Sequence, residues 1–462
     1  MLSFILDILS VPAVLIGLVS MIGLIAQKKG LSDILKGSIK TIMGVLILGG
    51  GAGLAVGALT HFGMMFQFGF GINGVVPHNE AIVGMALKEY GTQTALIMAF
   101  GMVANILIAR FTPLKFIFLT GHHTLYMACM IGIILTVGGL QGTTLVAVGA
   151  VLLGFVMALF PAIAHPTMKK ITGSDDVAFG HFSTLGYVLS AWVGSLVGNR
   201  EKTTEDINFP QSLAFLRDSS LAVSLVMLVL FLIVALACGP QYVETELSGG
   251  QNFLVFSLIQ AITFAGGVYV ILAGVRLILA EIVPAFTGIA TTLVPTAKPA
   301  IDCPVVYPYA PNAVLIGFLS SFAGGIVGMA VLLLADKSFP GLPIILPGVV
   351  PHFFCGATAG VFGNAAGGRL GAIIGAFLHG VLITFLPVWL LPVLGDLGFA
   401  NTTFSDADFG VVGIALGWLG GHAGRLAITA IVIGIVAALV VYNYAVPEKV
   451  SLDKQAEEKA KG

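Results

Sequence analysis

Three histidines and one aspartate stand where polar side chains are costly. His122 and His123 begin a long apolar run, His181 lies among small residues, and Asp302 sits between apolar residues just before Pro304. Imidazoles donate hydrogen bonds to hydroxyl groups and attract an anion when protonated, whereas a carboxylate accepts hydrogen bonds from hydroxyls. Ionisable residues inside apolar segments usually mark a functional site. These four residues therefore predict a binding site for a hydrophilic solute.

Each of these groups also has a structural interpretation. The histidine pair could anchor a helix end at a membrane interface, and His181 could cap or tether a helix. Asp302 could form a structural salt bridge with Lys298 or Arg276. The sequence leaves both interpretations open.

A pentapeptide occurs twice, as Gly74-Val-Val-Pro-His78 and as Gly348-Val-Val-Pro-His352. Each copy follows a glycine-rich apolar run and precedes another apolar run. Proline and glycine break helices, and at membrane depth the freed backbone groups must be buried in protein or line a wet cavity. We therefore predict two re-entrant hairpins, near 73–90 and 343–365, in an inverted-topology repeat. Their helix N-termini would favour an anion, whereas two similar turns outside the membrane are the alternative.

Polar residues accompany both predicted hairpins. Asn79 and Glu80 follow the first copy, where Glu80 could also be solvated in an aqueous vestibule. His352 and Thr358 lie on the second, where a structural and a functional role are both open.

The composition predicts a membrane protein. Of 462 residues, 57% are hydrophobic and 9% are charged, against about 25% charged in soluble domains. Such a chain cannot cover itself with a water-compatible surface, so lipid must be its solvent and the fold class is all-α polytopic. The net charge of −1 does not indicate a nucleic-acid partner.

Apolar runs of spanning length predict about 11 transmembrane helices. The division between the seventh and eighth run rests on Glu281 alone, and 411–421 is too short to span. We interpret 181–198 as a partly unwound or surface segment. The predicted spans lie near 11–27, 41–60, 92–110, 116–139, 143–164, 219–238, 253–280, 281–297, 312–335, 370–392 and 424–443.

Lysines and arginines set the predicted orientation. Basic residues between the first two spans, at 199–218 (including Arg217) and in the tail place the N-terminus outside and the C-terminus in the cytoplasm. The predicted parts are an N-terminal repeat, 1–218, with the cytoplasmic segment 199–218, a C-terminal repeat, 219–445, and the tail, 446–462.

No catalytic set is visible, so we expect a non-enzymatic subunit without cofactor or metal. The sequence has no Walker motif, its four cysteines lack metal-ligand spacing, and 199–218 is too short for an enzymatic domain. Polar residues among spans favour a solute pathway. An ion-coupled secondary transporter, with Glu80, His181 and Asp302 as a proton relay, and a membrane scaffold or channel are the alternatives.

Several blocks, in order, resemble the ascorbate-specific IIC permeases of the bacterial phosphotransferase system. They are Gly71-Ile-Asn-Gly74, Leu119-Thr-Gly-His122, Gly180-His181, Ala300-Ile-Asp302-Cys303, Ala310-Pro-Asn-Ala-Val314 and Leu346-Pro-Gly348. The resemblance implies an inner-membrane homodimer, in which a transport core with two hairpins moves like an elevator against a dimerising scaffold. It also implies L-ascorbate or a close analogue as substrate. A separate IIB would phosphorylate the substrate, and IIB would be charged through IIA, HPr and enzyme I.

The resemblance also implies a substrate pocket. Its residues would be Asn79, Glu80, His122, His123, Thr124, Leu125, Tyr126, His181, Phe182 and Asp302. The ascorbate permeases carry a Thr-Tyr pair at the position of Asn79 and Glu80, and glutamines at those of Tyr126 and Phe182. A related sugar or sugar acid therefore stays open as the substrate.

Overall fold

The computed structural model describes residues 12–26, 28–71, 74–207, 218–294, 296–399 and 401–445. Within these ranges, seven helices are long and apolar enough to cross a membrane, and three shorter apolar helices accompany them. The prediction of an all-α polytopic membrane protein is confirmed. Residues 208–217, which include Arg217, and the tail 446–462 lie outside the described residues.

The helices follow the predicted apolar runs in order. The first half contains α2 (Pro12–Ala26), α3 (Leu31–Phe70), α4 (Asn79–Phe111), α5 (Gly121–Val137), α6 (Gly142–Thr172) and α7 (Thr184–Val197). The second half contains α8 (Ser219–Cys238), α9 (Pro240–Tyr242), α10 (Phe253–Leu293), α11 (Pro311–Asp336), α12 (Val349–Pro351), α13 (Ala357–Leu390) and α14 (Ala407–Ala445).

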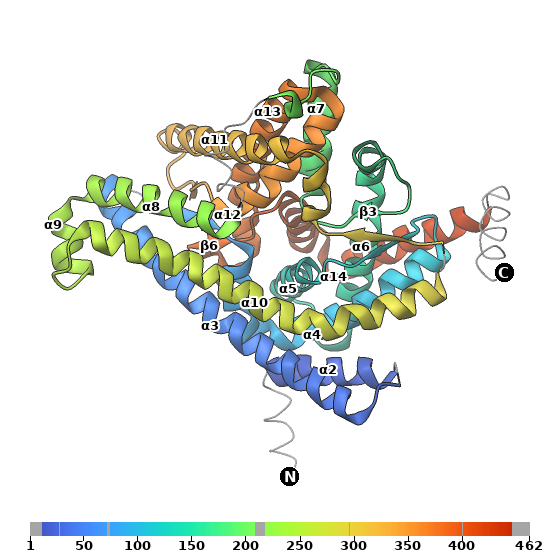
Figure 1. The fold of residues 1–462 in the computed structure, drawn as a ribbon. Helices are drawn as coiled ribbons and strands as arrows, with labels where there is room; N and C mark the ends of the chain where they lie inside the picture. Colours follow the sequence, from blue (N-terminus) through green and yellow to red (C-terminus); the bar gives the residue numbers. More distant parts are fainter. Residues whose placement is uncertain are drawn as a thin grey trace, which may run out of the picture.

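The two longest helices, α3 and α10, run side by side across the molecule (Figure 1). A Cβ atom on Gly44 would lie 2.6 Å from the carbonyl oxygen of Gly274, and one on Gly51 would lie 2.8 Å from that of Gly267. The two backbones therefore touch at glycines seven residues apart on each helix, in antiparallel order. Small residues permit this close approach, on which helix association in lipid depends.

The predicted break at Glu281 is wrong, because α10 continues through it as one helix of 41 residues. A charge interrupts an apolar run, but glutamate is a good helix former and leaves the backbone hydrogen bonds intact. At 1.5 Å per residue the helix is about 60 Å long, roughly twice the thickness of the bilayer's hydrocarbon core.

The segment 181–198 is partly non-helical, as interpreted from the sequence. Residues 181–183 and Gly198 are non-helical, and α7 between them is a regular helix of 14 residues with one buried face. A Cβ atom on Gly194 would lie 2.8 Å from the carbonyl oxygen of Gly363 on α13. The small residues that weaken the hydropathy signal are those that let α7 pack closely against α13.

Six short strands within the described ranges form two parallel sheets that the sequence did not predict. The strands are β1 (Gly74–Pro77), β2 (Phe116–Phe118), β3 (Ala178–Phe179), β4 (Lys298–Ile301), β5 (Ile344–Ile345) and β6 (Thr402–Thr403). One sheet has the order β5-β1-β6, with Gly74 opposite Ile344 and Val76 opposite Thr402. The other has the order β2-β4-β3, with Phe116 opposite Lys298 and Ala178 opposite Ala300.

The two sheets reveal an internal repeat. Exchanging β1 with β4, β2 with β5 and β3 with β6 converts the order of one sheet into that of the other. This repeat pairs β1 with β4, so the two pentapeptides are not equivalent: the first forms β1, whereas the second follows β5 and starts a helix at Val349. The two segments nevertheless lie side by side. The amide of Leu346, two residues before the second pentapeptide, donates to the Val75 carbonyl at 2.8 Å, and a Cβ atom on Gly348 would meet the Pro77 carbonyl oxygen. The insertion of the two halves with opposite topology stays a prediction.

Candidate solute-binding site

A cavity of about 380 Å³ lies where the carboxyl ends of all six strands meet. The segments after the strands supply nearly all of its lining: Asn79 and Glu80 after β1, His122 and His123 after β2, His181 after β3, Asp302, Cys303 and Pro304 after β4, Val350, Pro351, Phe354 and Cys355 after β5, and Ser405 and Asp406 after β6. Helix α10 adds Leu272 and Arg276.

The parallel topology explains why these distant segments converge. Parallel neighbours bring their carboxyl ends to one edge, and ligands commonly bind at such edges. Helices α4, α5, α7 and α14 begin directly beyond four of the strands, at Asn79, Gly121, Thr184 and Ala407. Helix N-termini carry partial positive charge and unpaired N–H groups, so this arrangement favours an anion or a strongly hydrogen-bonding solute.

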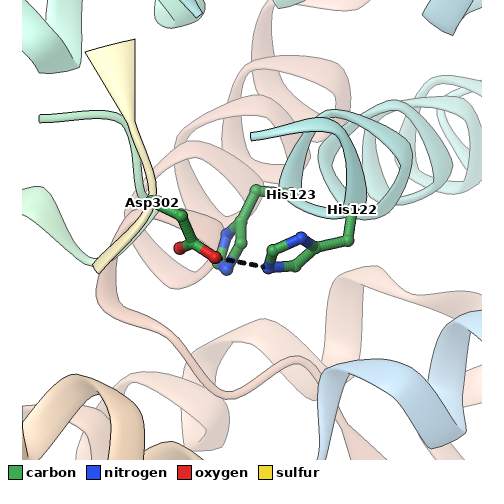
Figure 2. Close-up of side chains that lie close together, drawn as sticks. All are labelled: His122, His123 and Asp302. Atoms are coloured by element: carbon green, nitrogen blue, oxygen red, sulfur yellow. Dashed lines mark ion pairs between the residues drawn. The ribbon is translucent and has the colours of Figure 1, made fainter. Parts of the chain in front are cut away.

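Six of the ten predicted site residues line the cavity, including His122, His123 and Asp302. Figure 2 shows both histidines of α5 reaching towards Asp302, with Nε2 of His122 3.5 Å from Oδ2 of Asp302. Lys298, a proposed structural partner of Asp302, instead pairs with Asp175 at 2.6 Å. Asp302 therefore faces imidazoles and the cavity rather than that lysine.

His123 and His181 form the inner part of the site. Their ring centroids lie 3.7 Å apart, and both side chains are buried. The Phe182 amide donates to Nδ1 of His123 at 3.3 Å, and the Tyr187 hydroxyl lies 2.8 Å from Nδ1 of His181. These bonds orient both rings, so each Nε2 atom is the one left to meet a solute or a carboxylate.

Glu80 is buried and paired rather than solvated in a vestibule. It is 8% exposed, and its Oε2 atom lies 3.0 Å from Nδ1 of His78. The neighbouring Asn79 donates to Oδ1 of Asp406 at 2.8 Å and accepts from the Ser405 amide at 2.8 Å. The start of α4 is thereby tied to the turn before α14.

The other four predicted residues lie behind the cavity wall. Thr124 donates its hydroxyl hydrogen to the backbone of its own helix, and Leu125 is fully buried. The Tyr126 hydroxyl is buried without a hydrogen-bond partner, and Phe182 stacks on Phe118 at 4.6 Å. These residues shape the wall and do not face the cavity.

The residues of the second pentapeptide region serve the protein's own packing. His352 Nδ1 lies 2.8 Å from the Ser321 hydroxyl, and Thr358 donates to the Phe354 carbonyl at 2.8 Å. Both side chains are buried. These contacts support a structural role for His352 and Thr358.

Sequence reasoning missed two carboxylates at the start of α14. Asp406 is 3% exposed, and its Oδ2 atom lies 3.9 Å from Nε2 of His123 and 4.0 Å from Nδ1 of His181. Asp408 accepts from the Thr184 and Leu185 amides at 2.8 and 2.9 Å, and so caps the helix that follows His181. Two acidic residues just before an apolar run are a helix-start signal that could have identified them.

The donor atoms suit both solute hydroxyls and a metal ion. Ligand-type atoms of His122, His123 and Asp302 lie within 4.8 Å of one another, as do those of His123, His181 and Asp406. Imidazole and carboxylate groups bind zinc-like ions and also hydrogen-bond to sugars. The sensitivity of solute binding to a chelator discriminates between the two.

Residues 7–408 match the model of the EIIC-GAT family, described as the PTS system sugar-specific permease component. The chain belongs to this family. A related protein is the "Ascorbate-specific PTS system EIIC component" of Mycoplasma pneumoniae, which is 26% identical over 433 residues. The match covers 81% of this chain and 64% of the relative's length. Family membership and the seven apolar helices confirm the prediction of a multi-pass membrane protein of the sugar-permease type.

Proposed function

We propose that this permease is the IIC subunit of a phosphoenolpyruvate-dependent phosphotransferase system and carries L-ascorbate or a closely related sugar acid. A separate IIB protein phosphorylates the substrate at the cytoplasmic face, and IIA, HPr and enzyme I supply the phosphoryl group to IIB. The observation that supports this proposal most strongly is the convergence of six strand ends on one polar cavity.

The chemistry of the cavity suits a small hydroxylated anion. Helix N-termini favour its charge, and His122 and His181 offer ring nitrogens to its oxygens. Asp302 can accept hydrogen bonds from its hydroxyl groups. The printed name of the Mycoplasma relative supports ascorbate within this class.

Transport is proposed to be elevator-like, in a homodimer of the inner membrane with the N-terminus outside and the C-terminus in the cytoplasm. The long helices α3 and α10 pack against each other and contribute none of the six strands. This division suits a scaffold and a moving core. The glycine contacts between α3 and α10 would keep the scaffold rigid.

Uptake of radiolabelled L-ascorbate into membrane vesicles tests the proposal. Uptake is expected only with phosphoenolpyruvate, enzyme I, HPr, IIA and IIB together, and the product inside should be phosphorylated. Binding to the purified permease should persist in a chelator if hydroxyl recognition needs no metal ion. Uptake driven by a proton gradient alone would contradict the proposal.

The variant Asp302→Asn tests the site directly. It should weaken ascorbate binding at least tenfold and leave the melting temperature nearly unchanged, because Asp302 is half-buried and faces the cavity. Asp33→Asn, at an exposed position in the first turn of α3, is the matched control. Wild-type affinity in Asp302→Asn would remove Asp302 from the substrate site.

An ion-coupled secondary transporter is the second candidate, because carboxylates and imidazoles alternate around the cavity. His78 pairs with Glu80, and Nε2 of His181 lies 4.0 Å from Oδ1 of Asp302. Such pairs can carry a proton. Uptake by the permease alone in proteoliposomes, in proportion to an imposed pH gradient, would favour this candidate.

A further inference from the structure

Arg276 reaches the cavity from a part of the fold that contributes no strand. It lies on α10 one turn after Leu272, and both residues line the cavity together with the segments that follow the strands. Its side chain is exposed, and none of the hydrogen bonds or ion pairs found among the described residues involves it. An arginine inside a long apolar helix is costly unless it has a partner or a function.

The other charged groups of the cavity are three carboxylates, and each has a partner within the protein. Glu80 pairs with His78 at 3.0 Å, and Asp406 accepts from Asn79 at 2.8 Å. Asp302 accepts from the amide of Cys303 at 2.7 Å. Arg276 is thus the one permanently charged cation that lines the cavity within the described part of the chain.

In this charge distribution, Arg276 is the main counterweight to the three carboxylates. Without Arg276, an anionic solute would meet three carboxylates, and only ionisable imidazoles and helix ends would offset them. With it, a planar fork of N–H donors is available, and this fork matches carboxylate and enolate oxygens in pairs.

We propose that Arg276 is the residue that selects an anionic substrate, by binding its carboxylate or enolate oxygens from the α10 side of the cavity. This inference rests on the proposed function and deepens it, because it names the side chain that would hold the substrate's negative charge. The anion would then be held between Arg276 of α10 on one side and the segments that follow the strands on the other.

The experiment compares an anion and a neutral molecule of similar shape on the purified, full-length permease. Binding of L-ascorbate, of gluconate and of the uncharged dehydroascorbate and glucose is measured for wild type, Arg276→Gln and Arg276→Lys. Lys36→Gln, which removes an exposed cation of α3, is the control. The Gln variant should bind the anion at least tenfold more weakly than wild type does. Its affinity for any neutral probe that wild type binds should stay within twofold of the wild-type value. The Lys variant should recover part of the loss because it keeps the charge but not the fork.

Two results would overturn the inference. One is an unchanged anion affinity in Arg276→Gln. If that variant also loses anionic lipid that co-purifies with wild type, Arg276 binds a lipid headgroup and not the substrate. The other is a wild-type permease that binds neutral sugars and no anion. Failure of the proposed function has a different signature, because wild type would then bind the anion but show no uptake that depends on phosphoenolpyruvate and IIB.

Discussion

Replacing Asp408 with alanine is expected to destabilise this permease by about 3 kcal/mol. The carboxylate is fully buried, and its two oxygens accept separately from the Thr184 and Leu185 amides at 2.8 and 2.9 Å. Each buried donor left without a partner costs roughly 1–3 kcal/mol, so the two together cost roughly 2–6 kcal/mol, and this figure already contains the loss of the helix N-cap. Partial relaxation of the loop keeps the sum near the lower half of that range.

Two further variants grade the effect. Asp408→Asn keeps one acceptor oxygen, so about half the loss is expected. Asp336 is the control, because it also accepts two backbone N–H bonds, from Gly341 and Leu342, but near the surface. Water replaces its lost bonds, so Asp336→Ala should cost less than about 1 kcal/mol.

The assay is reversible unfolding of the purified permease in mixed detergent micelles, followed by tryptophan fluorescence. Ascorbate affinity is measured in parallel, and a decrease of at least threefold is expected for Asp408→Ala because the capped helix follows the loop that carries His181. Equal destabilisation by Asp408→Ala and Asp336→Ala would refute the argument, since burial is its only distinguishing term.

Two other perturbations have clear signs. Gly274→Val should destabilise the permease by about 1–3 kcal/mol, because its Cβ atom would lie 2.6 Å from a carbonyl oxygen of α3; Gly266→Val, with nothing within 4 Å of its Cβ atom, should be nearly neutral in the same unfolding assay. Hydrogen bonds, chiefly from Lys298, hold the pKa of the Asp175 carboxyl well below its usual range. Its stabilising contribution is therefore complete above pH about 4 and is lost as the pH falls below that value. Because Asp175 is 55% exposed, Asp175→Asn should lower stability at pH 7 by less than about 1 kcal/mol. A wild-type advantage that does not shrink between pH about 5 and pH about 2 would contradict this account.

Much of the fold could be predicted because membrane helices are specified locally. A run of about 20 apolar residues suffices to predict a span, and most predicted spans correspond to helices such as α8 and α11. The polar groups His122, His181 and Asp302 were also visible, because each interrupts an apolar context within its own segment. Hydropathy predicted a helix break at Glu281 because a charge interrupts the apolar run there, but the helical backbone of α10 continues through this residue.

Only the tertiary structure decided how these groups are assembled. Strands of two to four residues are too short for a period to be visible, and their parallel partners lie far along the chain: Val76 pairs with Thr402. Asp406 is held at the cavity by its hydrogen bond with Asn79, 327 positions away in the chain. Arg276 lines the cavity from α10, a helix that contributes no strand. Apolar periodicity is a property of neighbouring residues, whereas the cavity is a property of pairings between distant ones. The sequence therefore determined that polar chemistry lies within a membrane protein, and the packing determined which polar groups share it.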